Sequence, residues 1–252
     1  MSLKLALECP TPLLNDIQPL SDFYWVLCHL VLSDRDYANY YIKHRGEKLS
    51  TLDNSVNELL EPCSLSDMEK AVEVLDGVSR IVPPDYLGNH FATEKALDEA
   101  VEMFGKEKLL PAVQGHELRY VLECATYIKK LGFTEVAVPY DITCSRYDSI
   151  EGMAERREEI VGRMILLYGF DVHLLGMTTL EELESYRGID KVKSIDTGSP
   201  VMHGLWNLRF GRNGLLPKVT PTMEQMKLLG NPDLKSVYYN INYLKEIISG
   251  QK

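Results

Sequence analysis

Acidic side chains stand at the ends of short apolar segments of this chain, where they could take part in catalysis. The clearest case is KVKSIDTGSPV, residues 191–201, in which an alternating apolar run ends in Asp196 and a turn of small residues follows. A side chain in such a position is held by a rigid strand and still faces open space. The same pattern recurs at Asp53 with Asn54, at Asp85, at Gln114 with Gly115, at Asp141, and at His173 with Gly176.

These residue types favour a particular kind of chemistry if the strand ends meet in one pocket. Separated carboxylates can supply a nucleophile and a proton acceptor, and a primary amide can recognise the polar edge of a flat heterocycle. The spacing alone does not identify the reaction.

The elements that must position these residues alternate along the chain. Period-two apolar runs predict seven strands, at residues 23–32, 49–52, 80–82, 109–113, 135–138, 172–175 and 192–195. Helical periodicity, with Ser, Asp or Thr at several starts, predicts helices between them, at residues 34–43, 66–75, 93–104, 117–131, 152–168 and 179–186.

Repeated strand–helix units predict parallel strands joined by right-handed crossovers. We therefore expect an α/β fold, a TIM-type (β/α)8 barrel in one domain spanning residues 1–252, with a helical segment at residues 221–252. An open nucleotide-binding sheet is disfavoured, because no glycine-rich turn follows the first predicted strand. The eighth strand is not evident, and residues 204–220 are expected to hold it or to replace it.

Composition limits the class of protein. No segment has the roughly 18 consecutive apolar residues of a membrane span, and residues 1–12 lack the layout of a signal peptide, so a cytoplasmic location is expected. Five scattered cysteines without a CxxC pair argue against disulfides and a zinc knuckle. The net charge of −10 argues against indiscriminate nucleic-acid binding but not against a local basic face.

Several segments resemble the tRNA-guanine transglycosylases, the queuine and archaeosine tRNA-ribosyltransferases. Residues 111–138, PAVQGHELRYVLECATYIKKLGFTEVAV, are similar to the guanine-recognition segment of that family. VHLLGM at residues 172–177 resembles its His/Met-Gly strand, and IDTGSPV at residues 195–201 falls where it has a nucleophilic aspartate. LDNS at residues 52–55 and PPDYLG at residues 83–88 fall where it has further aspartates.

The resemblance implies a pentosyltransferase in which Asp196 forms a covalent glycosyl intermediate and Asp53 handles a proton of the base. Asp85, Gln114 and Gly115 would bind guanine, as would Gly176 and Asp141. The nucleic acid would contact the basic residues Arg209, Arg212 and Lys218.

Two departures from the family pattern concern the substrate. No cysteine follows Cys144, so the zinc site of the tRNA enzymes is not expected, and no cofactor is expected either. Val138-Pro139-Tyr140-Asp141 replaces the family's GG-rich loop. Both departures resemble phage and bacterial relatives that insert a 7-deazaguanine into DNA, in the cytosol of a bacterium or a phage-infected host. The expected partners are therefore DNA or tRNA, a free 7-deazaguanine base, and a protein that helps to open DNA.

Other readings remain open at this stage. Asp196, Asp53 and Asp141 are also ordinary turn or helix-capping residues, and His173 is more typical of a hydrogen-bonded structural residue. The three basic residues also suit a solvated loop. The chain is alternatively a tRNA-guanine transglycosylase, a noncatalytic subunit that binds nucleic acid or a partner, or an unrelated barrel hydrolase with paired carboxylates that cleaves sugars or nucleosides.

Overall fold

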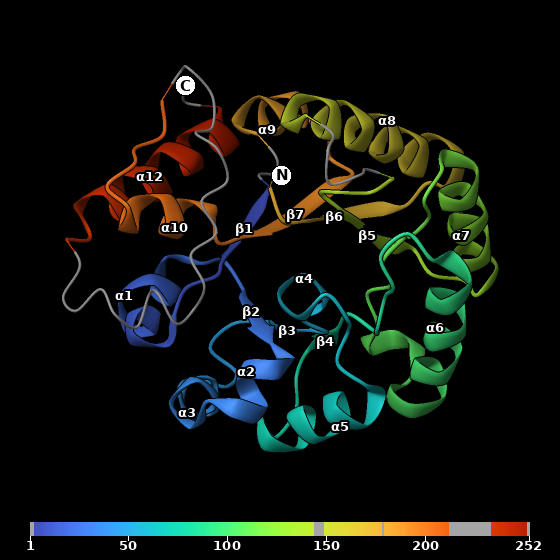
Figure 1. Cartoon of the computed structure of the whole chain (residues 1–252), viewed down its shortest axis with the longest axis horizontal. Coiled ribbons are helices and arrows are strands. Elements are labelled where there is room, and N and C mark those ends of the chain that lie inside the picture. The colour runs from blue at the N-terminus through green and yellow to red at the C-terminus, as the bar shows by residue number, and fades with distance from the viewer. Residues whose placement is uncertain (1–2, 144–148, 178, 212–232, 251–252) are drawn as a thin grey trace.

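The strands of the protein form a ring that the helices surround. The computed structural model describes residues 3–143, 149–177, 179–211 and 233–250 (Figure 1). The described strands, all paired in parallel, are β1 (Lys4–Leu7), β2 (Tyr24–Leu27), β3 (Ser50–Asp53), β4 (Arg80–Ile81), β5 (Glu135–Pro139), β6 (Asp171–Leu175) and β7 (Val192–Thr197). They build a four-stranded sheet in the order β1-β7-β6-β5 and a three-stranded sheet in the order β2-β3-β4.

Two junctions connect the sheets into the ring. Residues 109–113 lie between β4 and β5, with isolated bridges from Ile81 to Leu109 and from Ala112 to Ala137. On the other side, the backbone N–H of Asp22, just before β2, donates to the carbonyl of Leu5 in β1 at 2.7 Å. The regular ladder is interrupted at both junctions, and the predicted TIM-type α/β barrel is confirmed.

The missing strand of the barrel is the N-terminal one. β1 pairs with β7 and supplies the eighth position that we expected at residues 204–220. The eighth strand therefore does not come from residues 204–220, of which 204–211 form no strand and 212–220 lie outside the described part. Four residues give too short an apolar run to reveal a strand by periodicity.

Two other predicted strands needed correction. The run at residues 23–32 holds β2 only as far as Leu27, after which Cys28–Ser33 forms the helix α2. A continuous apolar run does not distinguish a buried strand from a buried helix. Residues 109–113 are extended and make bridges, but they form no regular strand.

The helices lie around the outside of the ring. The described ones are α1 (Leu14–Ile17), α2, α3 (Arg35–Lys43), α4 (Val56–Leu59), α5 (Leu65–Val74), α6 (His90–Phe104), α7 (Leu118–Lys130), α8 (Ile150–Tyr168), α9 (Leu180–Ser185), α10 (Ser199–Leu205) and α12 (Lys235–Ser249). Short 3-10 turns occupy Thr11–Leu13, Gln18–Leu20 and Lys106–Lys108. The six helices predicted from periodicity are present, and side chains of Asp34, Ser64, Asn89, Ser149 and Thr179 cap five of them.

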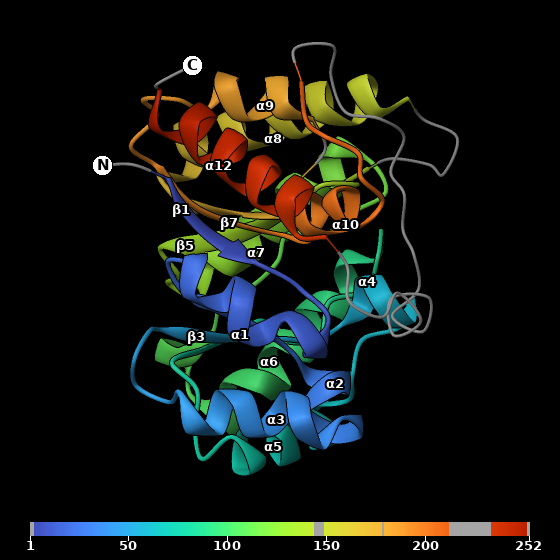
Figure 2. The ribbon, with the colours of Figure 1, turned by 90° about the vertical axis from the view of Figure 1, so that its left-hand side faces the viewer.

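One helix departs from this outer layer. The single-turn helix α4 lies over the end of the ring where the strands finish, in front of it in Figure 1 and at its right edge in Figure 2. None of its residues is buried. No helix of the described residues is long and apolar enough to cross a membrane.

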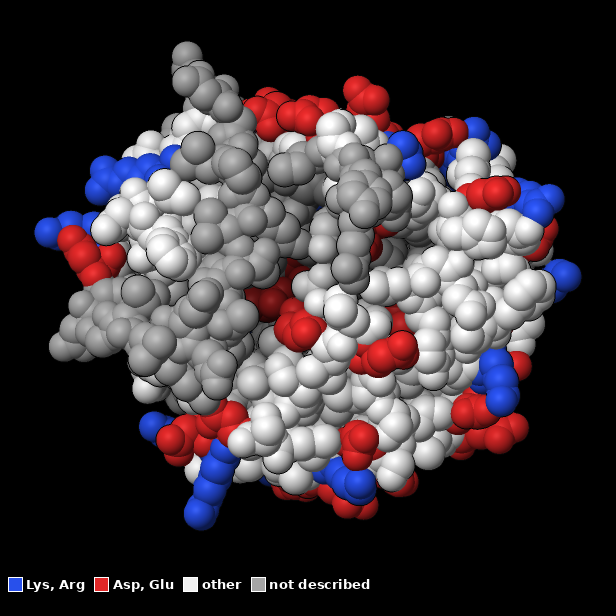
Figure 3. All heavy atoms as spheres, in the orientation of Figure 1, with Lys and Arg blue, Asp and Glu red and all other residues white. Residues whose placement is uncertain are grey.

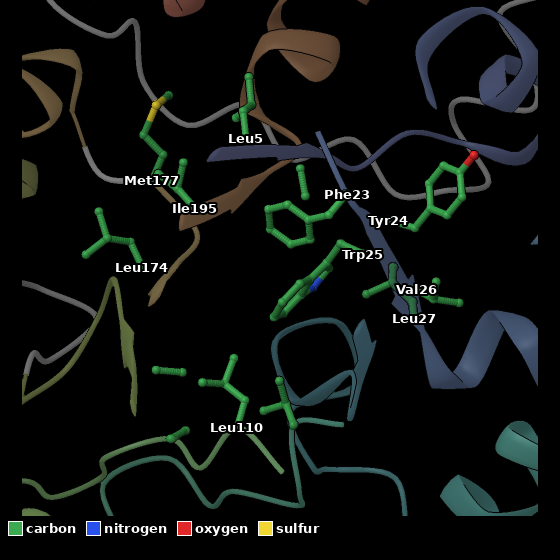
Figure 4. Close-up of a cluster of buried hydrophobic side chains, with 14 of the residues drawn as sticks. Leu5, Phe23, Tyr24, Trp25, Val26, Leu27, Leu110, Leu174, Met177 and Ile195 are labelled. Atoms are coloured by element: carbon green, nitrogen blue, oxygen red, sulfur yellow. The ribbon is translucent and has the colours of Figure 1, made fainter. Parts of the chain in front are cut away.

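Side-chain alternation fills the inside of the ring. On β2, Phe23 and Trp25 point toward the centre and Tyr24 points away, as Figure 4 shows. Trp25 stacks on the ring of His173 from β6, with centroids 4.7 Å apart. Because alternate residues of a strand face the same side, a residue at a strand's end continues a column that begins deeper in the barrel.

Candidate active site

A cavity of about 210 Å³ lies at the carboxyl ends of the strands. Its acidic lining residues come from the ends of five strands or the segments that follow them, and Figure 3 shows acidic side chains in and around the hollow on this face. They are Glu8, Asp53, Glu58, Asp85, Asp141 and Asp196. The described lining residues include no lysine or arginine, and apolar side chains such as Trp25, Leu27 and Met177 complete the wall.

Asp196 is held firmly at the end of β7. It is buried, with 4% of its surface exposed, and its Oδ1 lies 3.0 Å from Nε2 of His173. The backbone N–H of Gly176 donates to the same carboxylate, at 3.3 Å from Oδ1. These donors fix the orientation of the Asp196 side chain.

Glu8 lies beside Asp196, because β1 and β7 are neighbours. Burial raises the pKa of Glu8 well above its ordinary value, and the charges of Asp196 and Glu58 and a hydrogen bond to Asp196 raise it further. Two carboxyl groups in contact do not both ionise easily. Glu8 therefore keeps its proton to higher pH than an ordinary glutamate does.

Asp53 enters the cavity from a strained turn after β3. The backbone N–H of Ser55 donates to Oδ2 of Asp53 at 2.7 Å, and Ser55 has a left-handed conformation with φ of 64°. Strain of this kind is often found at functional sites. Burial raises the pKa of Asp53 well above its ordinary value, and the charge of Glu58 adds to the effect.

Asp85 belongs to a buried hydrogen-bond network. Nδ2 of Asn54 lies 2.7 Å from its Oδ1, and Nε2 of Gln114 lies 2.5 Å from its Oδ2. Burial still raises the pKa of Asp85, although these two hydrogen bonds oppose the shift. Only 2% of Asp85 is exposed, and it contributes to the cavity wall.

Gln114 and Gly115 support the site from behind. Neither belongs to the residues that line the cavity, and Oε1 of Gln114 accepts the backbone N–H of Gly88 at 3.0 Å. A Cβ on Gly115 would lie 2.6 Å from the backbone nitrogen of Val121, so α7 can pack closely only against glycine. The amide that we expected to face a substrate therefore orients Asp85.

Gly176 and Asp141 both line the cavity, as expected for residues that contact a ligand. Gly176 has a φ of 69°, and a Cβ there would lie 2.9 Å from Cδ1 of Tyr140. Nη1 of Arg157 donates to the carbonyl of Gly176 at 2.9 Å. Arg157 is fully buried and pairs with Glu182.

The expected nucleic-acid contacts are only partly described. Arg209 is exposed, and its guanidinium lies over the ring of Tyr239, 5.1 Å from the centroid. Arg212 and Lys218 lie outside the described residues. DNA, tRNA, a free 7-deazaguanine and a DNA-opening protein stay predictions that no observation on this structure tests.

Sequence reasoning missed Glu8 and Glu58, whereas His173 is a buried, hydrogen-bonded residue of the kind that the sequence suggested. Glu8 follows the unrecognised strand β1, two positions after Ala6 in an alternating run. Glu58 lies on α4, which is too short to recognise by periodicity. Among the described residues no group of three or more His, Cys, Asp or Glu side chains is arranged to hold a metal ion.

The fold and the position of the cavity place the protein among the TIM-type barrels. Over 99% of both chains the structure is similar to that of KGPDC from Streptococcus mutans, with a TM-score of 0.56 and 10% identity. It is also similar to protein CitE from Mycobacterium tuberculosis in complex with magnesium and acetate, over 78% of this chain and 86% of that one, with a TM-score of 0.52 and 8% identity. At such low identity these similarities define the fold alone.

The comparisons correct the expected family. No family model matches the chain, and no curated protein matches it. The structures that it resembles are KGPDC and CitE rather than a tRNA-guanine transglycosylase. The assignment to that family was therefore wrong, and with it the pentosyltransferase class and the exchange of guanine in phage or bacterial DNA. Short segments around strand-end aspartates recur among barrels because the fold itself favours polar residues there.

Proposed function

We propose that the protein is an enzyme that hydrolyses the glycosidic bond of a small, uncharged glycoside by carboxylate catalysis. The observation that carries the proposal is the contact between Glu8, a carboxyl group with a raised pKa, and Asp196 in an acidic cavity. The residues of the site, and not the fold, support this proposal, since unrelated chemistries share the barrel fold.

The site contains the groups that this reaction needs. Glycosidic cleavage passes through an oxocarbenium-like state, which nearby carboxylates stabilise. The leaving group needs a proton, and a carboxyl group with a raised pKa can donate it. Glu8 meets the second requirement, while Asp196 and Asp53 meet the first.

The closeness of the two carboxyl groups favours a covalent route. An inverting hydrolase keeps its carboxyl groups roughly 6.5–9.5 Å apart to hold a water molecule between them. Glu8 and Asp196 are hydrogen-bonded and leave no such space; a retaining pair is about 5–5.5 Å apart, so Glu8 must turn from Asp196 toward the leaving atom when substrate binds. Asp196 therefore attacks the anomeric carbon as Glu8 protonates the leaving atom; Glu8 then takes a proton from the water that releases the sugar and restores Asp196.

The shape and charge of the cavity restrict the substrate. A volume of about 210 Å³ is below the roughly 300–1,000 Å³ of sites for drug-sized ligands, so one ring at a time fits inside. The carboxylates among the six acidic side chains, with no lysine or arginine among the described lining residues, repel phosphate and carboxylate substituents. Trp25 offers an apolar surface on which a sugar or aromatic ring can lie.

The test is hydrolysis of a panel of aryl glycosides and free nucleosides, together with mass spectrometry of enzyme incubated with a slowly hydrolysed 2-fluoroglycoside. We expect turnover, a covalent adduct on the peptide containing Asp196, and loss of both in Asp196→Asn. The matched control is Asp171→Asn, at the opposite end of the barrel, where Asp171 pairs with Lys191 at 2.9 Å. Failure to cleave any compound of the panel, or full activity in Asp196→Asn, would contradict the proposal.

A further inference from the structure

A chain of hydrogen bonds runs along the inside of the barrel behind the carboxyl pair. Oγ of Ser194 lies 2.8 Å from Nδ1 of His173, and Nε2 of His173 lies 3.0 Å from Oδ1 of Asp196. Ser194 and Asp196 are two residues apart on β7, so both side chains face the interior. Each group of the chain thus has its partner on the neighbouring strand.

An irregularity in the sheet brings these groups into line. Val172 pairs with Val192, but the next residue, His173, pairs with Ser194. Lys193 is therefore the extra residue of a bulge between β6 and β7. Bulges of this kind redirect side chains and are common next to active sites. Without this bulge, His173 would face Lys193 and not Ser194.

The chain of hydrogen bonds connects the linings of two cavities. Asp196 lines the candidate active site, and Ser194 lines a second cavity of about 420 Å³ at the amino ends of the strands. Only 6% of Ser194 is exposed and His173 is fully buried. Ser194 therefore reaches the carboxyl pair only through His173.

The charges around His173 decide which nitrogen carries its proton. Burial lowers the pKa of His173, although Asp196 on one side opposes this, and Arg80 and Glu135 act on it with opposite signs from the other. The imidazole is therefore neutral and has one N–H group. The carboxylate of Asp196 accepts from Nε2–H, so Nδ1 is left as an acceptor for the hydroxyl of Ser194.

Asp196 faces charged groups from several elements. Glu8 follows β1, and Asp53 with Glu58 approaches from β3 and α4; all three disfavour a second negative charge. Arg157 on α8 is a buried cation, and its charge interacts with Asp196 with the opposite sign. In such a balance a single well-oriented donor has a measurable effect on where the proton resides.

We propose that Ser194 is a positioning residue of the candidate active site: by donating to Nδ1 it fixes the Nε2–H form of His173, which keeps the proton shared by Glu8 and Asp196 on Glu8. The division of roles between the two carboxyl groups rests on the proposed function, but the hydrogen-bond chain does not. Ser194 acts at a distance and touches no substrate.

The test reads the protonation states in the full-length, substrate-free protein. NMR of ¹⁵N-labelled histidine gives the tautomer of His173, assigned by its loss in His173→Gln. NMR of ¹³C-labelled glutamate follows Glu8 with pH, assigned by its loss in Glu8→Gln. The variants are Ser194→Ala, Ser194→Cys, which keeps the volume but has only a weak donor, and Ser194→Thr, which keeps the hydroxyl. Ser79→Ala removes an exposed hydroxyl from the same cavity and is the control.

We expect wild-type His173 to be protonated at Nε2. We also expect Ser194→Ala and Ser194→Cys to move the first ionisation of the carboxyl pair to higher pH, by about three- to tenfold in its equilibrium constant, the effect of weakening one hydrogen bond. Ser194→Thr and Ser79→Ala should titrate like the wild type. Protonation of His173 at Nδ1, or an unchanged titration in Ser194→Ala and Ser194→Cys, would overturn the proposal. Because no substrate is present, these outcomes are independent of whether a glycoside is hydrolysed.

Discussion

Arg157 and Glu182 form an ion pair from which solvent is fully excluded, with Nε of Arg157 2.5 Å from Oε1 of Glu182. The guanidinium also donates to the carbonyls of Leu175 and Gly176, at 3.0 and 2.9 Å. The pair thus connects α8 and α9 to the turn whose N–H contacts Asp196. A buried charge pair holds this turn only while both partners are present, because either charge left alone is costly to bury.

Loss of one member of this pair should be strongly destabilising. We expect Arg157→Met or Glu182→Met to lower the free energy of unfolding by about 3–5 kcal/mol, because a buried charge is left alone, and the double variant to lose much less. Urea denaturation of the two single variants and the double variant measures the coupling. The exposed pair Arg163 and Glu159, also on α8, is the control and should contribute about 0.3–0.5 kcal/mol. A loss in the double variant equal to the sum of the two single losses would show that the charges do not depend on each other.

The raised pKa of Glu8 makes stability depend on pH with a definite sign. Unfolded Glu8 ionises near 4.5, whereas folded Glu8 keeps its proton to higher pH. Between these values the folded state binds more protons, so the free energy of unfolding falls as pH rises, by about 1.4 kcal/mol per pH unit for one proton. Glu8→Gln should flatten this slope by up to one proton, as measured by denaturation at a series of pH values.

Other buried carboxyl groups should keep part of the pH dependence of the unfolding free energy in the Glu8 variant. Burial also raises the pKa values of Asp53 and Asp85, so some loss of stability with rising pH should persist in Glu8→Gln. Glu99→Gln, an exposed change on α6, should leave the slope unaltered. A slope in Glu8→Gln equal to that of the wild type would mean that Glu8 ionises normally in the folded protein.

Removal of the Gln114 side chain should show how much its hydrogen bond to Asp85 contributes to the free energy of unfolding. Gln114→Leu leaves Oδ2 of Asp85 and the N–H of Gly88 without these partners, and we expect a loss of about 1–3 kcal/mol in unfolding free energy. Asp85→Asn in the same background should recover part of it, because a neutral side chain is less costly to bury. Asn57→Ala removes an exposed amide bonded to Tyr140 and should change stability by no more than about 0.5 kcal/mol. A loss in Gln114→Leu as small as that of Asn57→Ala would contradict the supporting role of Gln114.

The glycine at position 176 can be tested by adding one methyl group. Gly176→Ala places Cβ against the ring of Tyr140 in a left-handed conformation, so we expect a loss of about 1–2 kcal/mol and a displaced Tyr140. Tyr140→Ala in the same background should remove the steric part and leave the backbone part. Gly162→Ala, inside α8 with no atom within 4 Å of the new Cβ, is the control and should stabilise by up to about 1 kcal/mol. Denaturation and a crystal structure of Gly176→Ala measure both effects, and an undisplaced Tyr140 would argue against the steric account.

The sequence by itself determined the barrel and the places where polar residues meet. Alternation of strand and helix periods specified parallel strands, and Asp53, Asp85, Asp141 and Asp196 all line the cavity at the strand ends. This works because the positions follow from local rules: a strand alternates its faces, and parallel strands end on the same side. The same local rules explain why a resemblance built on short strand-end segments pointed to the wrong family.

Only the tertiary structure decided how these residues work together. Glu8 became a partner of Asp196 because β1 closes against β7, which are far apart in sequence. Gln114 was expected to face a substrate, and Arg157 stands among alternating charges in the sequence, yet both are buried and bond to the groups beside the cavity. Such roles depend on packing between distant segments, and burial sets the pKa values of the carboxyl groups, so neither can be read from spacing along the chain.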